Sequence, residues 1–227
     1  PDRLRAVAED FIKHYENRVA EGATVAGKAM FVCSNRYIAY DLYKIIRELR
    51  PEWTEKKICD DGAILNDKDK KVLKPMEKIK LVMTRNKDDE PELFEMLGSK
   101  DDRKEFDRQF KNPKSNFKIA IVVDMWLTGF DVPELDTIYI DKPIQQHTLI
   151  QTISRVNRVC EGKDKGLIVD YIGIKKNMNM ALKKYTNFES EEFEGVEQSI
   201  TMLLSVTIVM VVWLKTESDI YVLVVMK

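Results

Sequence analysis

The 227-residue sequence is poor in metal-binding residues and has almost no net charge. Its 3 Cys and 2 His are scattered and fit no zinc-site spacing: Cys33, Cys59, Cys160, His14 and His147. We therefore expect no bound metal, and the unpaired thiols are typical of a reducing cytoplasm. Lys and Arg total 37 against 38 Asp and Glu, a net charge of -1, so any contact with nucleic acid must be local.

Three further absences exclude other classes of protein. The chain opens at Pro1 without Met and without a charged-then-apolar leader, which indicates a piece of a longer protein and not a secreted one. It has no G-x-x-x-x-G-K-[ST] loop to hold nucleotide phosphates, so we expect no ATP hydrolysis by this chain alone. A membrane helix needs about 20 apolar residues. The charge-free run at residues 200–214 is shorter, so we expect no membrane association.

Helical and strand patterns alternate along most of the chain. Apolar residues at positions 4, 7, 11, 12 and 15 predict an opening helix that ends before Gly22. Short apolar runs predict strands at 29–33, 79–83, 119–123, 137–140 and 166–170, with helices at 38–49, around 105–110 and around 149–160. Residues 60–75 are polar and predict an exposed excursion. This order predicts an α/β fold, a mostly parallel sheet with helices on both faces.

A polar stripe on the predicted helix near residue 150 is the strongest candidate for a ligand site. At about 100° per residue, Gln151, Arg155 and Arg158 fall within roughly 60° of one another. The opposite side of this helix is apolar: Leu149, Ile153, Val156 and Cys160. Arginine offers a planar, permanently charged fork suited to phosphate oxygens. The alternative is an ordinary solvated helix face.

The loop before this helix strengthens the phosphate-binding interpretation. Residues 119–123 predict a buried parallel strand, and ligands of α/β sheets bind beyond the carboxyl ends of such strands. Gly129 permits a positive φ or a close backbone approach, and Pro133 stiffens the end of the loop. Asp131 offers a carboxylate to a ribose or a backbone amide, or else caps a turn.

Four passages carry a resemblance to a known family. They are DMWLTGFDVP (124–133), QTISRVNR (151–158), KAMFVCSNRYIAYDLYKII (28–46) and GLIVDYIGI (166–174). They resemble the second RecA-like motor domain of superfamily-two helicases and translocases and, more narrowly, the R subunit of type I restriction enzymes. Ser154, where generic helicases commonly carry Gly, fits the R-subunit pattern. The resemblance implies a linker helix at 1–27, a RecA-like P-loop-NTPase-type domain at 28–198 and an apolar tail at 199–227.

The resemblance also implies roles for these residues. Motifs V and VI of the family match 124–133 and 151–158, so Arg158 would be an arginine finger, supported by Arg155 and Gln151. Gly129 and Asp131 would link the nucleotide to the DNA grip. The chain would then be part of the ATP-dependent translocase of a type I site-specific deoxyribonuclease. ATP and Mg²⁺ would be bound in the intact subunit, mainly by the first motor domain. Its partners would be that domain, the nuclease domain, the methyltransferase and specificity subunits, and double-stranded DNA.

Candidate DNA contacts lie at two strand ends and in the later loop. Ser34 and Arg36 follow the first strand, Thr84 and Arg85 follow the second, and Thr128 lies in the loop; all suit phosphate oxygens, which carry no sequence information. Helix capping and ordinary loop polarity are equally open. Two to four such contacts predict weak binding with a log-log salt slope of about -2 to -4.

Two questions stay open at this point. A non-catalytic α/β nucleotide- or protein-binding module, such as a receiver-like domain using Asp124, would need neither Arg155 nor Arg158. The apolar runs at 200–214 and 221–226 fit a strand or a buried helix equally well. They depart from the family pattern and could be a misassigned or frame-shifted tail, a helix packed on a neighbouring domain, or an anchor.

Overall fold

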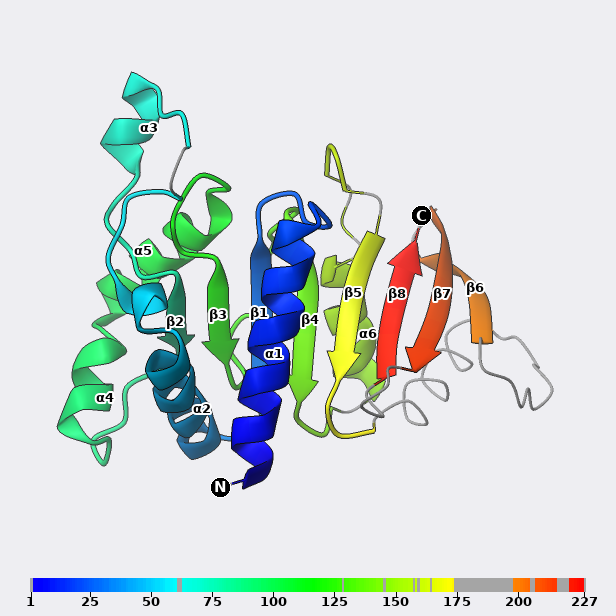
Figure 1. The fold of residues 1–227 in the computed structure, drawn as a ribbon, viewed down its shortest axis with the longest axis horizontal. Helices are drawn as coiled ribbons and strands as arrows, with labels where there is room; N and C mark the ends of the chain where they lie inside the picture. The colour runs from blue at the N-terminus through cyan, green and yellow to red at the C-terminus, as the bar shows by residue number, and fades with distance from the viewer. Residues whose placement is uncertain are drawn as a thin grey trace.

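The computed structural model describes residues 2–60, 63–127, 129–144, 146–156, 158, 160–163, 165–173, 198–204, 207–215 and 221–226. Its helices are α1 (Asp2–Ala20), α2 (Arg36–Leu49), α3 (Asp67–Val72), α4 (Pro91–Met96), α5 (Lys100–Lys111) and α6 (Gln146–Val156), with a 3₁₀ turn η1 (Pro51–Thr54) (Figure 1). Its strands are β1 (Lys28–Cys33), β2 (Ile79–Val82), β3 (Ile119–Val122), β4 (Leu135–Asp141), β5 (Lys165–Asp170), β6 (Gln198–Leu204), β7 (Thr207–Lys215) and β8 (Tyr221–Met226).

Five strands form a parallel sheet in the order β2-β3-β1-β4-β5. Ala29 of β1 pairs with Ile119 of β3 on one side and with Thr137 of β4 on the other, so the central strand β1 is hydrogen-bonded to a neighbouring strand on both sides. Each predicted strand is present, and the predicted α/β class with a mostly parallel sheet is confirmed. Because neighbouring strands are parallel, each connection must cross over the sheet, which places the helices on its faces.

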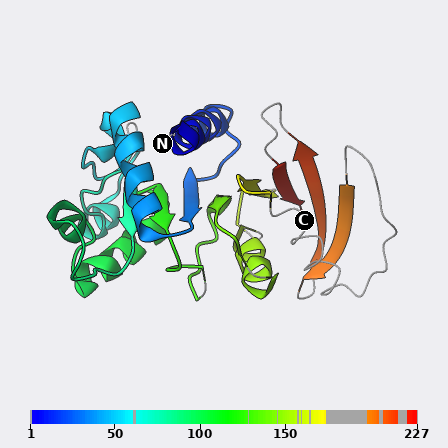
Figure 2. The ribbon, with the colours of Figure 1, turned by 90° about the horizontal axis from the view of Figure 1, so that it is seen from below.

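The two faces of the sheet have separate apolar cores. Met30 and Val32 of β1 lie in a core with Phe110 of α5, whereas Phe31 lies in a core with Phe11 of α1. This alternation is the period-two pattern of a strand buried on both sides. Figure 2 shows α1 on one face and α6 on the other, which confirms the predicted helices on both faces.

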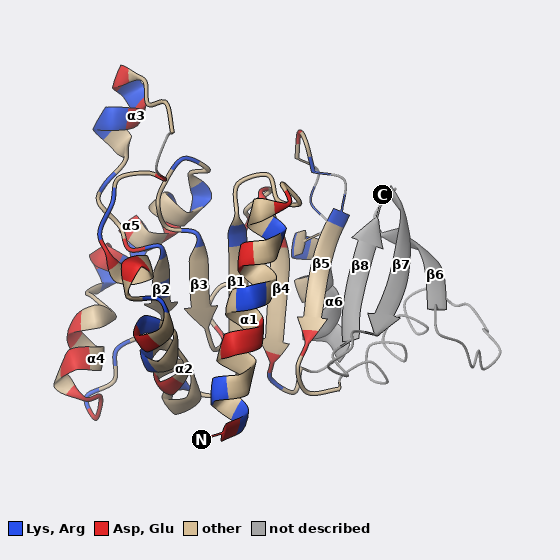
Figure 3. Cartoon of the chain, viewed as in Figure 1, with Lys and Arg blue, Asp and Glu red and all other residues tan. Residues whose placement is uncertain are grey.

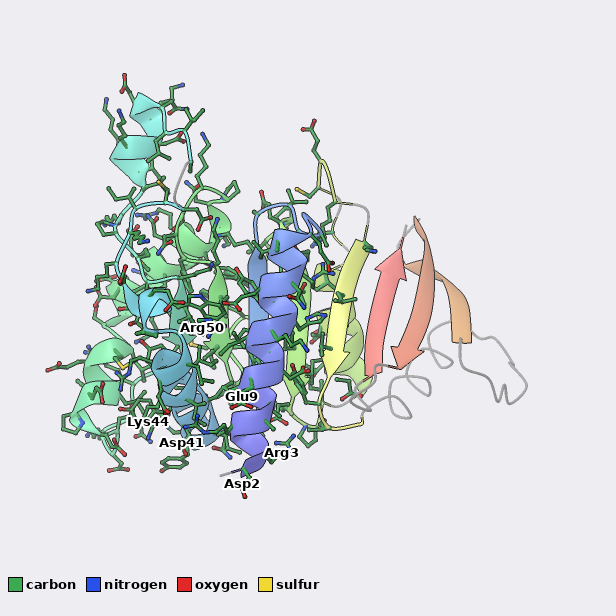
Figure 4. All side chains as sticks on the ribbon, viewed as in Figure 1. Asp2, Arg3, Glu9, Asp41, Lys44 and Arg50 are labelled. Carbon is green, nitrogen blue, oxygen red and sulfur yellow. The ribbon has the colours of Figure 1, made fainter. Side chains whose placement is uncertain are left out.

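Helix α1 packs along the sheet and is tied down at several points. Phe11 is fully buried and meets Tyr139 edge-on, with ring centroids 4.7 Å apart. Burying such a ring contributes about 1.5–3 kcal/mol. Arg3, near the N-terminal end of α1 in Figure 4, pairs with Asp141 at the end of β4. The opening helix is therefore confirmed, and it lies against the same domain that follows it.

Two short helices were not predicted, although their sequences contain start signals. Asn66 and Asp69 form a capping box at the start of α3, and Pro91 occupies the first turn of α4. Helix α3 has no buried residue, in agreement with the predicted exposed excursion. Apolar periodicity misses such helices because they have no continuous apolar face to detect.

The described residues of the C-terminal tail are strands. β8 pairs antiparallel with β5, and β7 and β6 follow at the far edge of an eight-stranded sheet. The helical interpretation of the tail is therefore wrong for 198–204, 207–215 and 221–226. Segments rich in Val and Ile favour strands, because β-branched side chains pack well on a pleated surface. Among the described residues, no helix has the length and apolar character to cross a membrane.

Candidate functional site

The parallel sheet separates the predicted site residues into two groups. Ser34, Arg36, Thr84 and Arg85 follow the carboxyl ends of β1 and β2. The end of α6, with Arg155, returns to the opposite edge of the sheet, because β5 begins there. The two edges also differ in charge in Figure 3, where acidic residues lie at the carboxyl ends of β4 and β5 and basic residues at the amino ends of β1 and β5. The two groups therefore occupy opposite edges.

The loop at 123–134 joins these two edges along one face of the sheet. Its apolar side chains, Trp126, Leu127, Phe130 and Val132, are buried in the core that contains Phe110. Gly129 is exposed, and its φ of +70° confirms the predicted left-handed backbone. Thr128 lies outside the described residues. The loop is therefore held from within and presents Gly129 and Asp131 to solvent.

Arg155 and Arg158 both contact this loop, in different ways. Nε of Arg155 donates to the carbonyl oxygen of Leu127 at 2.9 Å. Burial lowers the pKa of the half-buried Arg155 guanidinium, the Asp131 carboxylate raises it, and the charge of Arg158 lowers it. Arg158 instead pairs with Asp131 at 3.2 Å, and both side chains are 58% exposed. Arg155 is thus a fixed brace, whereas Arg158 has an accessible guanidinium.

The predicted helical stripe needs one correction. Helix α6 ends at Val156, so Arg158 lies beyond it and only Gln151 and Arg155 share the helix. The amide of Arg158 still bonds to the carbonyl of Arg155 at 3.4 Å, which is the tighter i to i−3 bond common at helix ends. The chain thus leaves the helix while keeping the two arginines together. Gln151 is half-buried, one turn earlier on α6.

Close packing at the start of β5 fixes the end of α6. A Cβ on Gly166 would lie 2.3 Å from the carbonyl oxygen of Val156, so only glycine permits this approach. In the connection between them, Nζ of Lys163 donates to the carbonyls of Pro133 at 2.9 Å and Leu135 at 2.7 Å. These contacts hold the loop end and the helix end in one place.

At the carboxyl edge, the predicted DNA contacts have partners within the protein. Arg36 pairs with Asp89 and donates to the Thr84 carbonyl at 3.3 Å. Arg85 lies over the ring of Phe94, with Cζ 4.3 Å from the centroid. Between Ser34 and Arg36, Asn35 accepts from the amide of Ile38 and caps α2, so the helix-capping alternative left open for this strand end is confirmed at Asn35. The group is therefore ordered by contacts of its own.

Asp124 lies just past the carboxyl end of β3. Its carboxylate pairs with Lys142 and its side chain is 81% exposed. In the part of the chain that the structure describes, no group of three His, Cys, Asp or Glu could hold a metal ion. A hollow of about 990 Å³ beside β2, α4 and α5 is lined partly by charges that neutralise one another, such as Lys80 with Glu77 at 3.4 Å. Neither Arg155 nor Arg158 lines this hollow.

Fold and site together define an α/β domain of the RecA-like type with an arginine pair beside a strand-exit loop. Residues 25–173 match the family model described as "Type I restriction enzyme subunit R domain 3". The chain therefore belongs to the R subunit family of type I restriction enzymes.

Relatives with curated descriptions agree with this assignment. The chain is 42% identical over 189 residues to the type I restriction enzyme HindI endonuclease subunit of Haemophilus influenzae, covering 82% of this chain and 16% of that protein. It is 40% identical over 187 residues to the putative type I restriction enzyme MjaIXP endonuclease subunit of Methanocaldococcus jannaschii, covering 82% and 15%. The chain thus spans less than a fifth of the length of these relatives.

The sequence did not reveal which residues hold the arginines and the loop in place. Asp89, which holds Arg36, lies in a charge-dense segment that gave no pattern. The pairing of Trp126 with Phe130 was also missed, although both flank the Thr-Gly pair at 128–129. The available signal was their four-residue spacing in a loop that also contains Leu127 and Val132.

Proposed function

We propose that this chain supplies the second half of the ATP-driven DNA translocase motor of a type I restriction enzyme. Its task is to present Arg158 to the phosphates of ATP, as an arginine finger reaching from the neighbouring domain. The observation that carries this proposal is the position of Arg158, whose accessible side chain pairs with the equally exposed Asp131 at the edge of the loop. Membership of the R subunit family supports it.

Magnitudes favour transfer of Arg158 from Asp131 to a nucleotide. An exposed ion pair contributes about 0–1 kcal/mol, so releasing Arg158 costs little. A triphosphate offers several charged oxygens, two of which can bond to the planar guanidinium fork at once. Hydrogen bonds to charged groups contribute about 1.5–3 kcal/mol each. Asp131 therefore serves as a resting partner. It holds the Arg158 guanidinium in place until the nucleotide-binding domain closes on this one.

This chain fits one side of an ATP site and not the whole of it. Arg158 and the open space around Gly129, where a Cβ would meet nothing within 4 Å, suit an approaching anion. The sequence has no loop of the G-x-x-x-x-G-K-[ST] type. We therefore infer that ATP and Mg²⁺ are bound mainly by a preceding motor domain, and that Arg158 stabilises charge that develops on the transferring phosphoryl group.

The carboxyl edge is the proposed DNA side of the motor. Ser34, Arg36, Thr84 and Arg85 lie beyond the ends of β1 and β2, and Thr128 belongs to the connecting loop. Contacts there would reach the phosphate backbone, which suits a motor that moves on any sequence. The nuclease, methyltransferase and specificity components would complete the enzyme in the cytoplasm.

The test is DNA-stimulated ATP hydrolysis by the intact subunit carrying Arg158→Ala. Because a finger acts mainly in the transition state, kcat should fall by about 10³ or more while ATP affinity changes less. Arg5→Ala is the matched control, since Arg5 also forms an exposed pair, with Glu48 at 2.9 Å, but on α1 and α2. Turnover by Arg158→Ala similar to that of Arg5→Ala would reject the proposal.

A further inference from the structure

Two stacked aromatic rings close the loop between β3 and β4. The rings of Trp126 and Phe130 lie 4.0 Å apart, centroid to centroid, with an interplanar angle of 2°. They are 8% and 5% exposed, and the Phe110 ring of α5 lies 5.2 Å from Trp126. Nζ of Lys111 lies 4.9 Å from the centroid of the Phe130 ring. Both ends of the turn at 126–130 are therefore fixed in the core.

The backbone at Trp126 adopts a conformation that its side chain disfavours. Its φ of +68° makes it the one non-glycine residue with positive φ within the described ranges. A Cβ crowds the neighbouring carbonyl in this region, and bulky residues rarely occupy it. Such strain persists only where surrounding contacts over-determine it, and it often occurs at functional sites. Here the surrounding contacts are those of the aromatic stack.

The same turn carries the partners of both arginines. The Leu127 carbonyl, one residue after Trp126, accepts from Nε of Arg155. Asp131, one residue after Phe130, pairs with Arg158. Between these points the backbone passes through the exposed Gly129 at φ +70°. The stack therefore fixes the Leu127 carbonyl that holds Arg155, and the amide of Arg158 bonds in turn to the Arg155 carbonyl.

We propose that the Trp126–Phe130 stack is a positioning element for Arg158, acting through the Leu127 carbonyl and the Arg155 side chain that it holds. This inference rests on the proposed motor function. Without the stack, Trp126 returns to a negative φ, the Leu127 carbonyl turns away from Arg155, and the end of α6 loses its brace. A misplacement of about 1 Å at a reacting centre can cost about 10²-fold in rate. Trp126 itself touches no substrate.

The experiment compares Trp126→Leu, Trp126→Phe and Trp53→Leu in the intact subunit. Trp53 is the matched control, because it is 4% exposed but lies in the core on the other face of the sheet. For Trp126→Leu we expect kcat of DNA-stimulated ATP hydrolysis to fall about 30- to 100-fold, with KM for ATP within about threefold. Trp126→Phe keeps a stacking ring and should recover kcat to within about fivefold of the parent. Trp53→Leu should lower the melting temperature as much and leave kcat nearly unchanged.

Two results overturn the inference: a kcat for Trp126→Leu within about fivefold of the parent, or an equal loss in Trp53→Leu. If Trp126→Leu does not fold, Phe130→Leu removes the other ring and is judged by the same criteria. Arg158→Ala measured in parallel separates the two proposals. Normal turnover in Arg158→Ala rejects the motor function itself. Loss in Arg158→Ala with normal turnover in Trp126→Leu rejects only the positioning role.

Discussion

Two arginine–aspartate pairs, Arg36 with Asp89 and Arg158 with Asp131, lie at opposite edges of the sheet and are built differently. At the carboxyl edge, the Arg36 and Asp89 side chains are 22% and 3% exposed. At the opposite edge, Arg158 and Asp131 are both 58% exposed. Breaking a buried pair leaves a charge without water or partner, whereas an exposed pair separates at little cost. The same two residue types therefore form a fixed structural contact in one place and a replaceable one in the other.

The surroundings of each pair explain this difference. Asp89 also accepts from the backbone amide of Asn86 at 2.6 Å, so its carboxylate organises the turn after β2. Arg36 begins α2, directly after the residue that caps the helix. Asp131 and Arg158, by contrast, lie on a loop and on the chain just past a helix end. Structural order at the first pair and accessibility at the second follow from these positions.

The largest effect on stability is expected at Gly166, which supports the end of α6. Gly166→Ala would place a Cβ 2.3 Å from the Val156 carbonyl, and backbone cannot give way there as a flexible side chain can. We expect a loss of about 3 kcal/mol in the free energy of unfolding, measured by denaturant titration.

Gly22→Ala provides the control for Gly166→Ala. A Cβ on Gly22 would meet nothing within 4 Å, although its φ is +66°. It should lose only about 1 kcal/mol, from backbone strain alone. Equal losses in the two variants would mean that the contact between α6 and β5 is looser than the structure has it.

A smaller loss is expected when the buried pair is broken. Arg36→Ala removes the partner of the nearly buried Asp89 carboxylate, and we expect a loss of about 1–3 kcal/mol in unfolding free energy. Adding Asp89→Asn removes the stranded charge and should recover part of that loss. If Arg36→Ala is as stable as the parent in thermal unfolding, the pair does not stabilise the fold.

The smallest effect is expected at the exposed pair. Asp131→Asn removes the resting partner of Arg158, and an exposed pair contributes about 0–1 kcal/mol, so kcat of ATP hydrolysis by the intact subunit should change by less than about fivefold. The melting temperature should stay within about 2 °C of the parent. A loss approaching that of Arg158→Ala would give Asp131 a direct part in the reaction and contradict its role as a resting partner.

Much of the fold could be predicted because its strands have strong local patterns. Residues 119–122 form a continuous buried run, and such runs also mark the other four parallel strands. Strand and buried helix stayed open for the tail because a short apolar run carries no period that separates the two. Helices α3 and α4 escaped because each has only six residues and little or no buried face.

The candidate site was predictable in its residues but not in its geometry. The Thr-Gly-Phe-Asp order and the two arginines indicated phosphate chemistry, yet helical spacing placed Arg158 on α6, which ends at Val156. The end of a helix depends on tertiary contacts, here those of Gly166 and Lys163, which lie after it in the chain. Partner choice is likewise non-local, since Arg36 and Asp89 are 53 positions apart.

The most direct test of the difference between the two pairs is Arg158→Lys in the intact subunit, assayed for DNA-stimulated ATP hydrolysis. Lysine keeps the charge and can still pair with Asp131, but it lacks the planar fork that addresses two phosphate oxygens at once. If Arg158 is a finger released from an exposed pair, kcat should fall by about 10² or more with no change in melting temperature. Turnover close to that of the parent, or a marked loss of stability, would contradict the account.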